Sequence, residues 1–183
     1  LTEMVVGGIV WFMKLKGKIE EALNRQINQE MAAAYGYLAA SAWFDENNFD
    51  GFAKWMELQR QEELEHAAKL INYLHDRGGK LTLAAVEQPK AEFRSVMEVF
   101  QSALRNEENN TASIHALYKL AAEEDDYPTQ SFLKWFIDEQ VEEERTMNDA
   151  IGMLEHAGDD RSALLVLNEQ MGRRTPEADS EAQ

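Results

Sequence analysis

The chain has 183 residues, 44% of them hydrophobic, which suits one domain with a full core that needs no disulfides. It contains no cysteine, which excludes zinc ribbons, thiolate clusters, cysteine nucleophiles and thiol redox switches, and is compatible with a reducing, cytoplasmic location. Thirty-four acidic and 18 basic residues give a formal net charge of −16, which repels nucleic acid and anionic membranes and attracts cations, although acidity can also serve solubility alone. We therefore expect no nucleic-acid partner and no membrane partner.

Residues 1–13 are predicted to be an N-terminal extension outside the fold. Their apolar run of about nine residues is too short to cross a bilayer. Basic residues precede the apolar region of a secretory signal, whereas here Lys14, Lys16 and Lys18 follow it. Met13 stands just ahead of the first amphipathic pattern and is the expected natural start.

Four long amphipathic helices are predicted, because apolar residues recur at helical spacing through four segments. These segments are about 15–44, 52–76, 92–123 and 129–156. The polar residues 47–51 are expected to provide a turn and the N-cap of the second helix. A short fifth helix is expected at about 161–171, where it must pack against the rest to be stable.

The segment 80–91 has no helical period and is predicted to be a long crossover between the second and third helices. About fourteen extended residues reach roughly 45 Å, and a helix of about 28 residues is roughly 42 Å long. The segment can therefore run the whole length of a bundle. The predicted fold is an all-α four-helix bundle spanning residues 14–172, followed by a polar tail at 173–183 that is expected to be disordered.

The second helix carries a carboxylate and an imidazole inside its apolar stripe. Glu63 and His66 fall within about 60° of the line through Phe52, Met56 and Leu70. A buried carboxylate is costly unless a charge partner or a metal compensates it. Glu-x-x-His is also the spacing of inward-facing metal ligands in helix bundles. Taken alone, such a motif more often belongs to a surface helix.

The other long helices repeat this arrangement near their midpoints, at Glu30, Glu107, Gln140 and Glu143. In a bundle of similar, nearly parallel or antiparallel helices the midpoints lie at one height, so six ligand-type side chains should meet in one layer. Carboxylates with one imidazole and no thiolate favour iron or manganese.

Two metal positions follow from this layer. The first is assigned to Glu30, Glu63 and His66. The second is assigned to Glu63, Glu107 and Gln140, with Glu63 bridging the two metals.

With these residues in place, the chain resembles the non-haem bacterial and archaeal ferritins from about residue 15 to residue 171. The matching elements are Asn28-Gln29-Glu30 followed by Tyr37, the run at 61–66, Glu107, the run at 126–129 and the run at 132–144. Each element alone is weak evidence for the resemblance, but their order and spacing together are specific to this family.

The resemblance implies a ferritin-like bundle in a homo-oligomeric shell of twenty-four subunits. Such a shell oxidises Fe(II) with dioxygen or hydrogen peroxide and stores ferric oxyhydroxide mineral, so ferroxidase activity and bound iron without haem are expected. The implied di-iron ligands are Glu30, Glu63, His66, Glu107 and Gln140. The implied third iron site consists of Glu62, Glu139, Glu142 and Glu143. Tyr37 matches a tyrosine beside the centre, although an ordinary core tyrosine is an equal alternative.

Related families fit less well. Bacterioferritins and rubrerythrin-like proteins have a second Glu-x-x-His on the last bundle helix, whereas here Arg145 stands three residues after Glu142. Two other function classes stay open: a carboxylate-bridged di-iron or di-manganese oxidase acting on a small organic substrate, and an acidic bundle used for protein association. The oxidase usually requires two core histidines. Particle size and iron loading distinguish the three classes.

Overall fold

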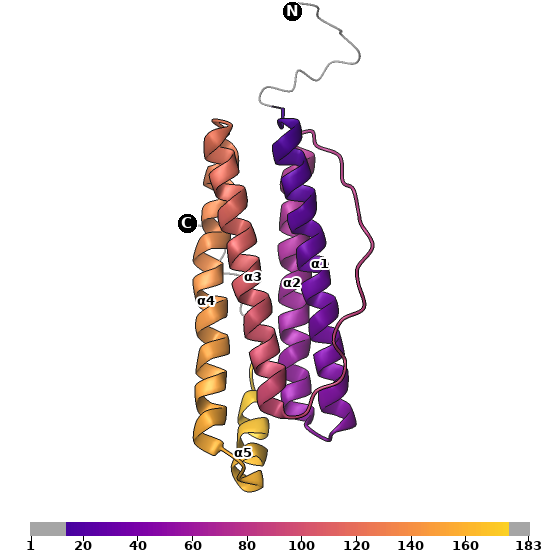
Figure 1. The fold of residues 1–183 in the computed structure, drawn as a ribbon, viewed down its shortest axis with the longest axis vertical. Coiled ribbons are helices and arrows are strands. Elements are labelled where there is room, and N and C mark those ends of the chain that lie inside the picture. Colours follow the sequence, from indigo (N-terminus) through magenta and orange to yellow (C-terminus); the bar gives the residue numbers. More distant parts are fainter. Residues whose placement is uncertain (1–13, 176–183) are drawn as a thin grey trace, which may run out of the picture.

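The structure is a computed structural model that describes residues 14–175. Within this range the chain forms five helices and no strand (Figure 1). They are α1 (Gly17–Glu46), α2 (Asp50–Asp76), α3 (Val96–Glu123), α4 (Tyr127–Ala157) and α5 (Arg161–Met171). The predicted all-α architecture with a short fifth helix is thus confirmed. Residues 1–13 and 176–183, on which the predicted extension and most of the predicted tail fall, lie outside the described residues.

The bundle consists of two helical hairpins. α1 packs chiefly on α2, α3 packs on α4, and the hairpins meet along α1 and α3. Within the described residues, no Cα atoms of α2 and α4 come within 8 Å of each other, so these two helices face each other across longer side chains. None of the described helices is both long enough and apolar enough to cross a bilayer.

The predicted crossover is present and runs along the outside of α1, from the end of α2 to the start of α3 (Figure 1). Two amides of α1 anchor its backbone: Asn24 Oδ1 accepts from the Thr82 N–H at 2.6 Å, and Asn28 Oδ1 accepts from the Ala84 N–H at 2.7 Å. α3 therefore begins at the far end of the bundle and runs parallel to α2.

Two helices begin at other residues than predicted because of their caps. α3 begins at Val96 and not near residue 92, because Ser95 Oγ accepts from the Glu98 N–H at 3.2 Å. α4 begins at Tyr127, ahead of the predicted residue 129. Here Asp126 accepts from the Thr129 N–H at 3.1 Å, and proline is tolerated in a first helical turn.

The N-cap position of α2 is Phe49, inside the predicted segment 47–51, but no side chain of this segment makes the capping hydrogen bond that its polar residues predicted. Asn168 of α5 takes that role, with its Oδ1 accepting from the Phe52 N–H at 2.9 Å. The close approach depends on Gly51, where a Cβ atom would lie 1.8 Å from the Asn168 carbonyl oxygen. Lys54 Nζ adds a bond to the Gly172 carbonyl at 2.8 Å. α5 therefore docks on the N-terminal end of α2.

The buried apolar residues form two clusters with a polar layer between them. One contains Phe44, Phe52 and Phe100. The other contains Ile27 and Leu70. Because apolar side chains lie on both sides, charges in the layer are poorly solvated and interact strongly.

Candidate metal centre

The polar layer between the two apolar clusters contains all six side chains that the sequence placed there. Their exposed fractions are 0% for Glu30, Glu63 and Glu107, 2% for Gln140, 4% for His66 and 5% for Glu143. Ionisable side chains are rarely buried to this degree unless they are paired or bind a metal.

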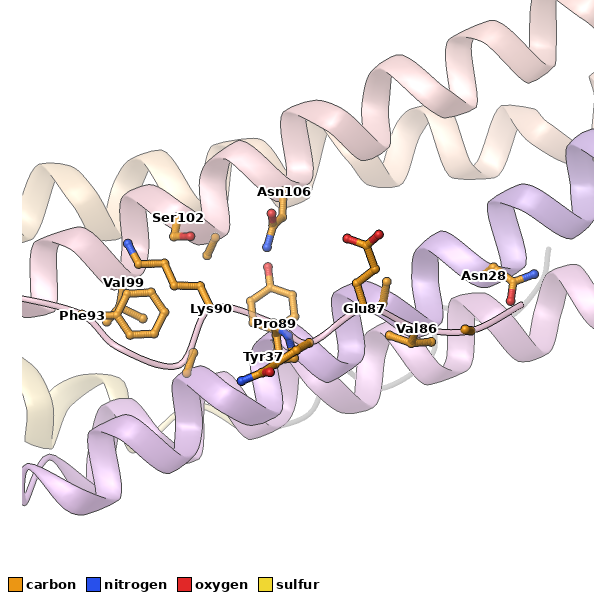
Figure 2. A pocket seen from close by; sticks show the side chains of 16 residues that line it. Asn28, Tyr37, Val86, Glu87, Pro89, Lys90, Phe93, Val99, Ser102 and Asn106 are labelled. Atoms are coloured by element: carbon orange, nitrogen blue, oxygen red, sulfur yellow. The ribbon is translucent and has the colours of Figure 1, made fainter. Parts of the chain in front are cut away.

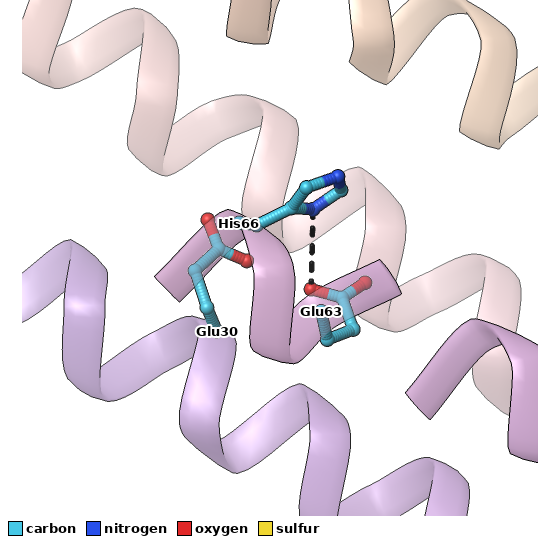
Figure 3. A group of neighbouring side chains, drawn as sticks. All are labelled: Glu30, Glu63 and His66. Carbon is cyan, nitrogen blue, oxygen red and sulfur yellow. Dashed lines mark ion pairs between the residues drawn. The ribbon is translucent and has the colours of Figure 1, made fainter. Parts of the chain in front are cut away.

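Glu30, Glu63 and His66 form one group of potential metal ligands in the layer (Figure 3). One ligand atom from each lies within 4.8 Å of the others, and His66 Nδ1 is 3.6 Å from Glu63 Oε2. Both Glu63 carboxylate oxygens and His66 Nδ1 are buried with no hydrogen-bond partner among the described residues. Buried polar atoms of this kind are costly, and one cation bound between them would satisfy all three. This is the donor set predicted for the first metal.

Glu107 lies near this group, because its charge acts on the Glu63 carboxyl. Its Oε1 accepts a hydrogen bond from the Tyr37 hydroxyl, while its Oε2 is buried without a partner in the described part of the chain. Gln140 Nε2 donates to the Glu107 backbone carbonyl at 3.3 Å and to Thr111 Oγ1 at 3.2 Å. Gln140 is thus held beside the backbone of Glu107, and the second metal position at Glu63, Glu107 and Gln140 stays a prediction.

Two buried amides hold Glu30 in place. Gln26 Nε2 donates to Glu30 Oε1 at 2.7 Å, and Asn110 Nδ2 donates to Glu30 Oε2 at 3.0 Å. Asn110 also approaches Gln140 Oε1 at 3.4 Å. The sequence analysis missed both amides. The signal that was available is their spacing, because Gln26 precedes Glu30 by one helical turn and Asn110 follows Glu107 by about one turn.

Burial is the largest cause of the pKa shifts of Glu63, Glu107 and His66. It raises the pKa of Glu63 well above the usual range, and the charges of Glu107 and Glu30 raise it further. Burial likewise raises the pKa of Glu107 to about 7, against the lowering effect of the Tyr37 hydrogen bond. Burial and the charge of Lys69 lower the pKa of His66 to about 4. At neutral pH the imidazole is therefore neutral, as a metal ligand must be, and a bound dication would displace protons from the carboxyl groups.

A second group adjoins the first through His66. Ligand atoms of His66, Glu139 and Glu143 also lie within 4.8 Å of one another. Gln59, which the sequence analysis did not single out, donates from Nε2 to Glu143 Oε2 at 2.8 Å. We call His66, Glu139 and Glu143 the outer acidic group.

The four residues implied for a third iron site occupy different environments. Glu139 and Glu143 belong to the outer acidic group, and Glu62 acts on it, because the Glu62 charge adds to burial and Glu107 in raising the pKa of Glu143. Glu142 belongs to neither group. Its side chain is 57% exposed and lies 3.8 Å from Arg145.

A cavity of about 430 Å³ lies between the crossover, α1 and α3. Figure 2 shows Tyr37 extending from α1 toward α3 at the wall of this cavity, with Asn106 opposite and Glu87 on the crossover. Because the Tyr37 hydroxyl also bonds Glu107, this side chain contacts both the cavity and the candidate metal centre.

Comparison with known proteins agrees with this arrangement. Residues 20–157 match the model of the ferritin-like domain family. Bacterial non-heme ferritins of Staphylococcus aureus (strain USA300) and Staphylococcus epidermidis are each 40% identical to the chain over 161 residues, which is 88% of this chain and 97% of theirs. The crystal structure of an open pore ferritin from the archaeon Archaeoglobus fulgidus superposes with a TM-score of 0.87 at 41% identity, covering 88% of this chain and 99% of that one. The chain therefore belongs to the ferritin family, in its non-haem bacterial and archaeal form.

Proposed function

We propose that this protein stores iron, oxidising Fe(II) at a di-iron centre inside each subunit and keeping the ferric product as a mineral within a hollow shell of twenty-four copies. The observation that carries the proposal is the Glu63 carboxylate, buried with both oxygens unpartnered in the described chain, beside His66 Nδ1 and Glu107 Oε2 in the same state. The similar proteins are a bacterial non-heme ferritin and an archaeal ferritin, which supports the same function.

Iron is the substrate in this proposal. One Fe(II) is held by Glu30, Glu63 and His66, and a second by Glu63, Glu107 and Gln140. Each Fe(II) gives up one electron. Dioxygen takes two electrons and two protons to become hydrogen peroxide, or hydrogen peroxide takes two electrons and two protons to become two water molecules.

The charges of the ligands favour release of the product. Glu30, Glu63 and Glu107 supply about three negative charges when ionised, against about four positive charges on two ferrous ions and six on two ferric ions. Because Gln140 is neutral, it adds no charge to hold the ferric pair. Glu62, Glu139, Glu142 and Glu143 offer anionic ligands near the centre and form the proposed third iron site.

The test is anaerobic loading with Fe(II) followed by stopped-flow oxidation in wild type and Glu63→Ala. We expect the oxidation rate of the variant to fall by more than the roughly 10–100-fold that is typical when a residue hydrogen-bonded to a metal ligand is changed. The matched control is Glu65→Ala, which removes an exposed carboxylate from the same helix and should oxidise iron at the wild-type rate.

Size-exclusion chromatography should show the same particle for all three proteins, near half a megadalton for twenty-four chains of 20.9 kDa. Wild-type oxidation by Glu63→Ala would refute the centre. Failure of the wild type to accumulate more than a few irons per chain would refute storage and favour an oxidase acting on an organic substrate.

A further inference from the structure

The segment that follows α5 returns to the bundle and places one cation beside the outer acidic group. Arg174 Nη2 lies 3.0 Å from Glu62 Oε1 and 3.2 Å from Glu62 Oε2. Its Nη1 donates to Gln59 Oε1, and Gln59 in turn donates to Glu143 Oε2 at 2.8 Å. A single guanidinium thus bonds one acidic residue directly and reaches a second through an amide.

The contact between Arg174 and Glu62 is largely shielded from solvent, unlike an ordinary surface ion pair. The side chains of Arg174 and Glu62 are only 19% and 20% exposed. The guanidinium carbon lies 5.3 Å from the ring centre of Trp55, which is 4% exposed. Guanidinium groups bind carboxylates in a planar fork and interact favourably with aromatic faces. Glu62, Gln59 and Trp55 therefore hold the arginine in place.

Arg174 lies on the side of the bundle where α2 faces α4. It contacts α2 at Trp55, Gln59 and Glu62, and Gln59 bridges to Glu143 on α4. α2 and α4 are the neighbouring helices whose described Cα atoms stay more than 8 Å apart. The charge of Arg174 also acts on Glu143: burial, Glu107 and Glu62 raise the pKa of that carboxyl, and Arg174 is among the groups that lower it.

We propose that Arg174 is an internal counter-ion of the third iron site, and that a cation binding Glu62 together with the outer acidic group must displace it. The inference rests on the proposed function, because it regulates a site of that function. A guanidinium and a metal cation neutralise the same carboxylates, so they compete for them. Arg174 therefore weakens cation binding at the third site and couples occupancy of that site to the position of the segment after α5.

The test uses Zn(II), which is redox-inert and binds carboxylate and imidazole, added to the assembled, metal-free protein near neutral pH. Binding is measured by calorimetry and by metal analysis after equilibrium dialysis. Sites that depend on Glu62 are identified by their loss in Glu62→Gln. Arg174→Gln should bind Zn(II) at these sites roughly tenfold more tightly than wild type.

The matched control is Arg173→Gln, because Arg173 is the neighbouring arginine and its guanidinium pairs at 2.7 Å with Glu169, where both side chains are more than 70% exposed. It should leave Zn(II) binding unchanged. In the Glu62→Gln background, Arg174→Gln should have no further effect. Equal Zn(II) affinities in wild type, Arg173→Gln and Arg174→Gln would overturn the proposal. So would the finding that Arg174→Gln binds no Zn(II) at sites that depend on Glu62.

Trp55 provides a second readout, because displacement of the guanidinium changes its surroundings. Zn(II) should alter the part of the tryptophan emission that Trp55→Phe removes, and this change should disappear in Arg174→Gln. A full-sized change in Arg174→Gln would contradict displacement. These readouts are independent of iron oxidation, so the Arg174 inference and the Glu63 assignment can fail separately.

Discussion

The Tyr37 hydroxyl donates a hydrogen bond to Glu107 Oε1, whereas Glu107 Oε2 is buried without a hydrogen-bond partner among the described residues. Burial raises the pKa of Glu107, and this hydrogen bond lowers it by favouring the ionised form. Tyr37→Phe should therefore weaken cation binding at the second metal position, by roughly tenfold or more for the loss of a hydrogen bond to a charged group. Zn(II) calorimetry and the initial rate of Fe(II) oxidation measure this.

Tyr35→Phe is the control for Tyr37→Phe, because Tyr35 is on the same helix and is 46% exposed. It should behave as wild type. If Tyr37→Phe binds two Zn(II) ions as tightly as Tyr35→Phe, the hydroxyl does not position Glu107.

Glu107 should also make the metal-free protein less stable as pH rises. Its pKa is about 7 in the folded chain against 4.5 ordinarily, so the folded state holds a proton that the unfolded chain has lost. The resulting stabilisation is fully present below about pH 4.5 and is lost as pH rises through about 7. His66 acts in the opposite sense, because its pKa falls from 6.5 to about 4 and its contribution grows with pH across that window.

Glu107→Gln should remove the first of these two effects. The stability of the variant relative to wild type should rise between about pH 5 and about pH 8, by a few kcal/mol at most. Thermal unfolding in the presence of a chelator gives the comparison. Parallel pH profiles for the two proteins would show that Glu107 is ionised in the metal-free bundle.

Gly51 should be essential for docking of α5. A Cβ atom at this position would lie 1.8 Å from the Asn168 carbonyl oxygen, which is backbone and cannot swing aside. Gly51→Ala is expected to lower the free energy of unfolding by about 1–3 kcal/mol and to raise hydrogen exchange in α5. Gly152→Ala is the control, since its Cβ would meet nothing within 4 Å and alanine is the better helix former. Equal stabilities of the two variants would show that α5 does not need this close approach.

Gln140→Glu should trap the ferric product. The added negative charge would hold two ferric ions more firmly, so the first round of oxidation should proceed normally and later rounds should slow severalfold. The ratio of later to first-round rates during repeated Fe(II) additions measures this by stopped-flow absorbance. Gln101→Glu, an exposed change on α3, is the control. If Gln140→Glu and Gln101→Glu give the same ratio, ligand charge at this position does not govern release.

The positions of the buried acidic residues could be predicted from the sequence, because a carboxylate inside an apolar stripe is visible from helical periodicity alone. The midpoints of four similar helices then fix one common height, and Glu30, Glu63 and Glu107 are all fully buried there. The fifth helix and the crossover followed from the same patterns.

The supporting amides could not be predicted in this way. Helical spacing places Gln26 and Asn110 one turn from Glu30 and Glu107, but whether an amide bonds a carboxylate depends on distances between helices that periodicity does not supply. The cap of α2 was missed for the same reason, because Asn168 is more than a hundred residues away in the chain and reaches Phe52 only through the path of α5.

The division of the ligands between two hairpins has a consequence for folding and for local opening. α1 with α2 and α3 with α4 can each form from contacts close in sequence, but Glu63 and Glu107 come together only when the hairpins dock. Docking of the iron-free chain therefore removes these two carboxyl groups from water and leaves both Glu63 oxygens and Glu107 Oε2 without hydrogen-bond partners among the described residues. This is a local conflict within an otherwise consistent fold. Helices ordinarily fray from their ends, but here amide exchange in the iron-free protein should also be fast at mid-helix, between two well-packed apolar clusters. A metal ion bound by residues of both hairpins would hold the bundle together at its centre, and its contribution to stability would grow with the logarithm of its concentration once the site is saturated.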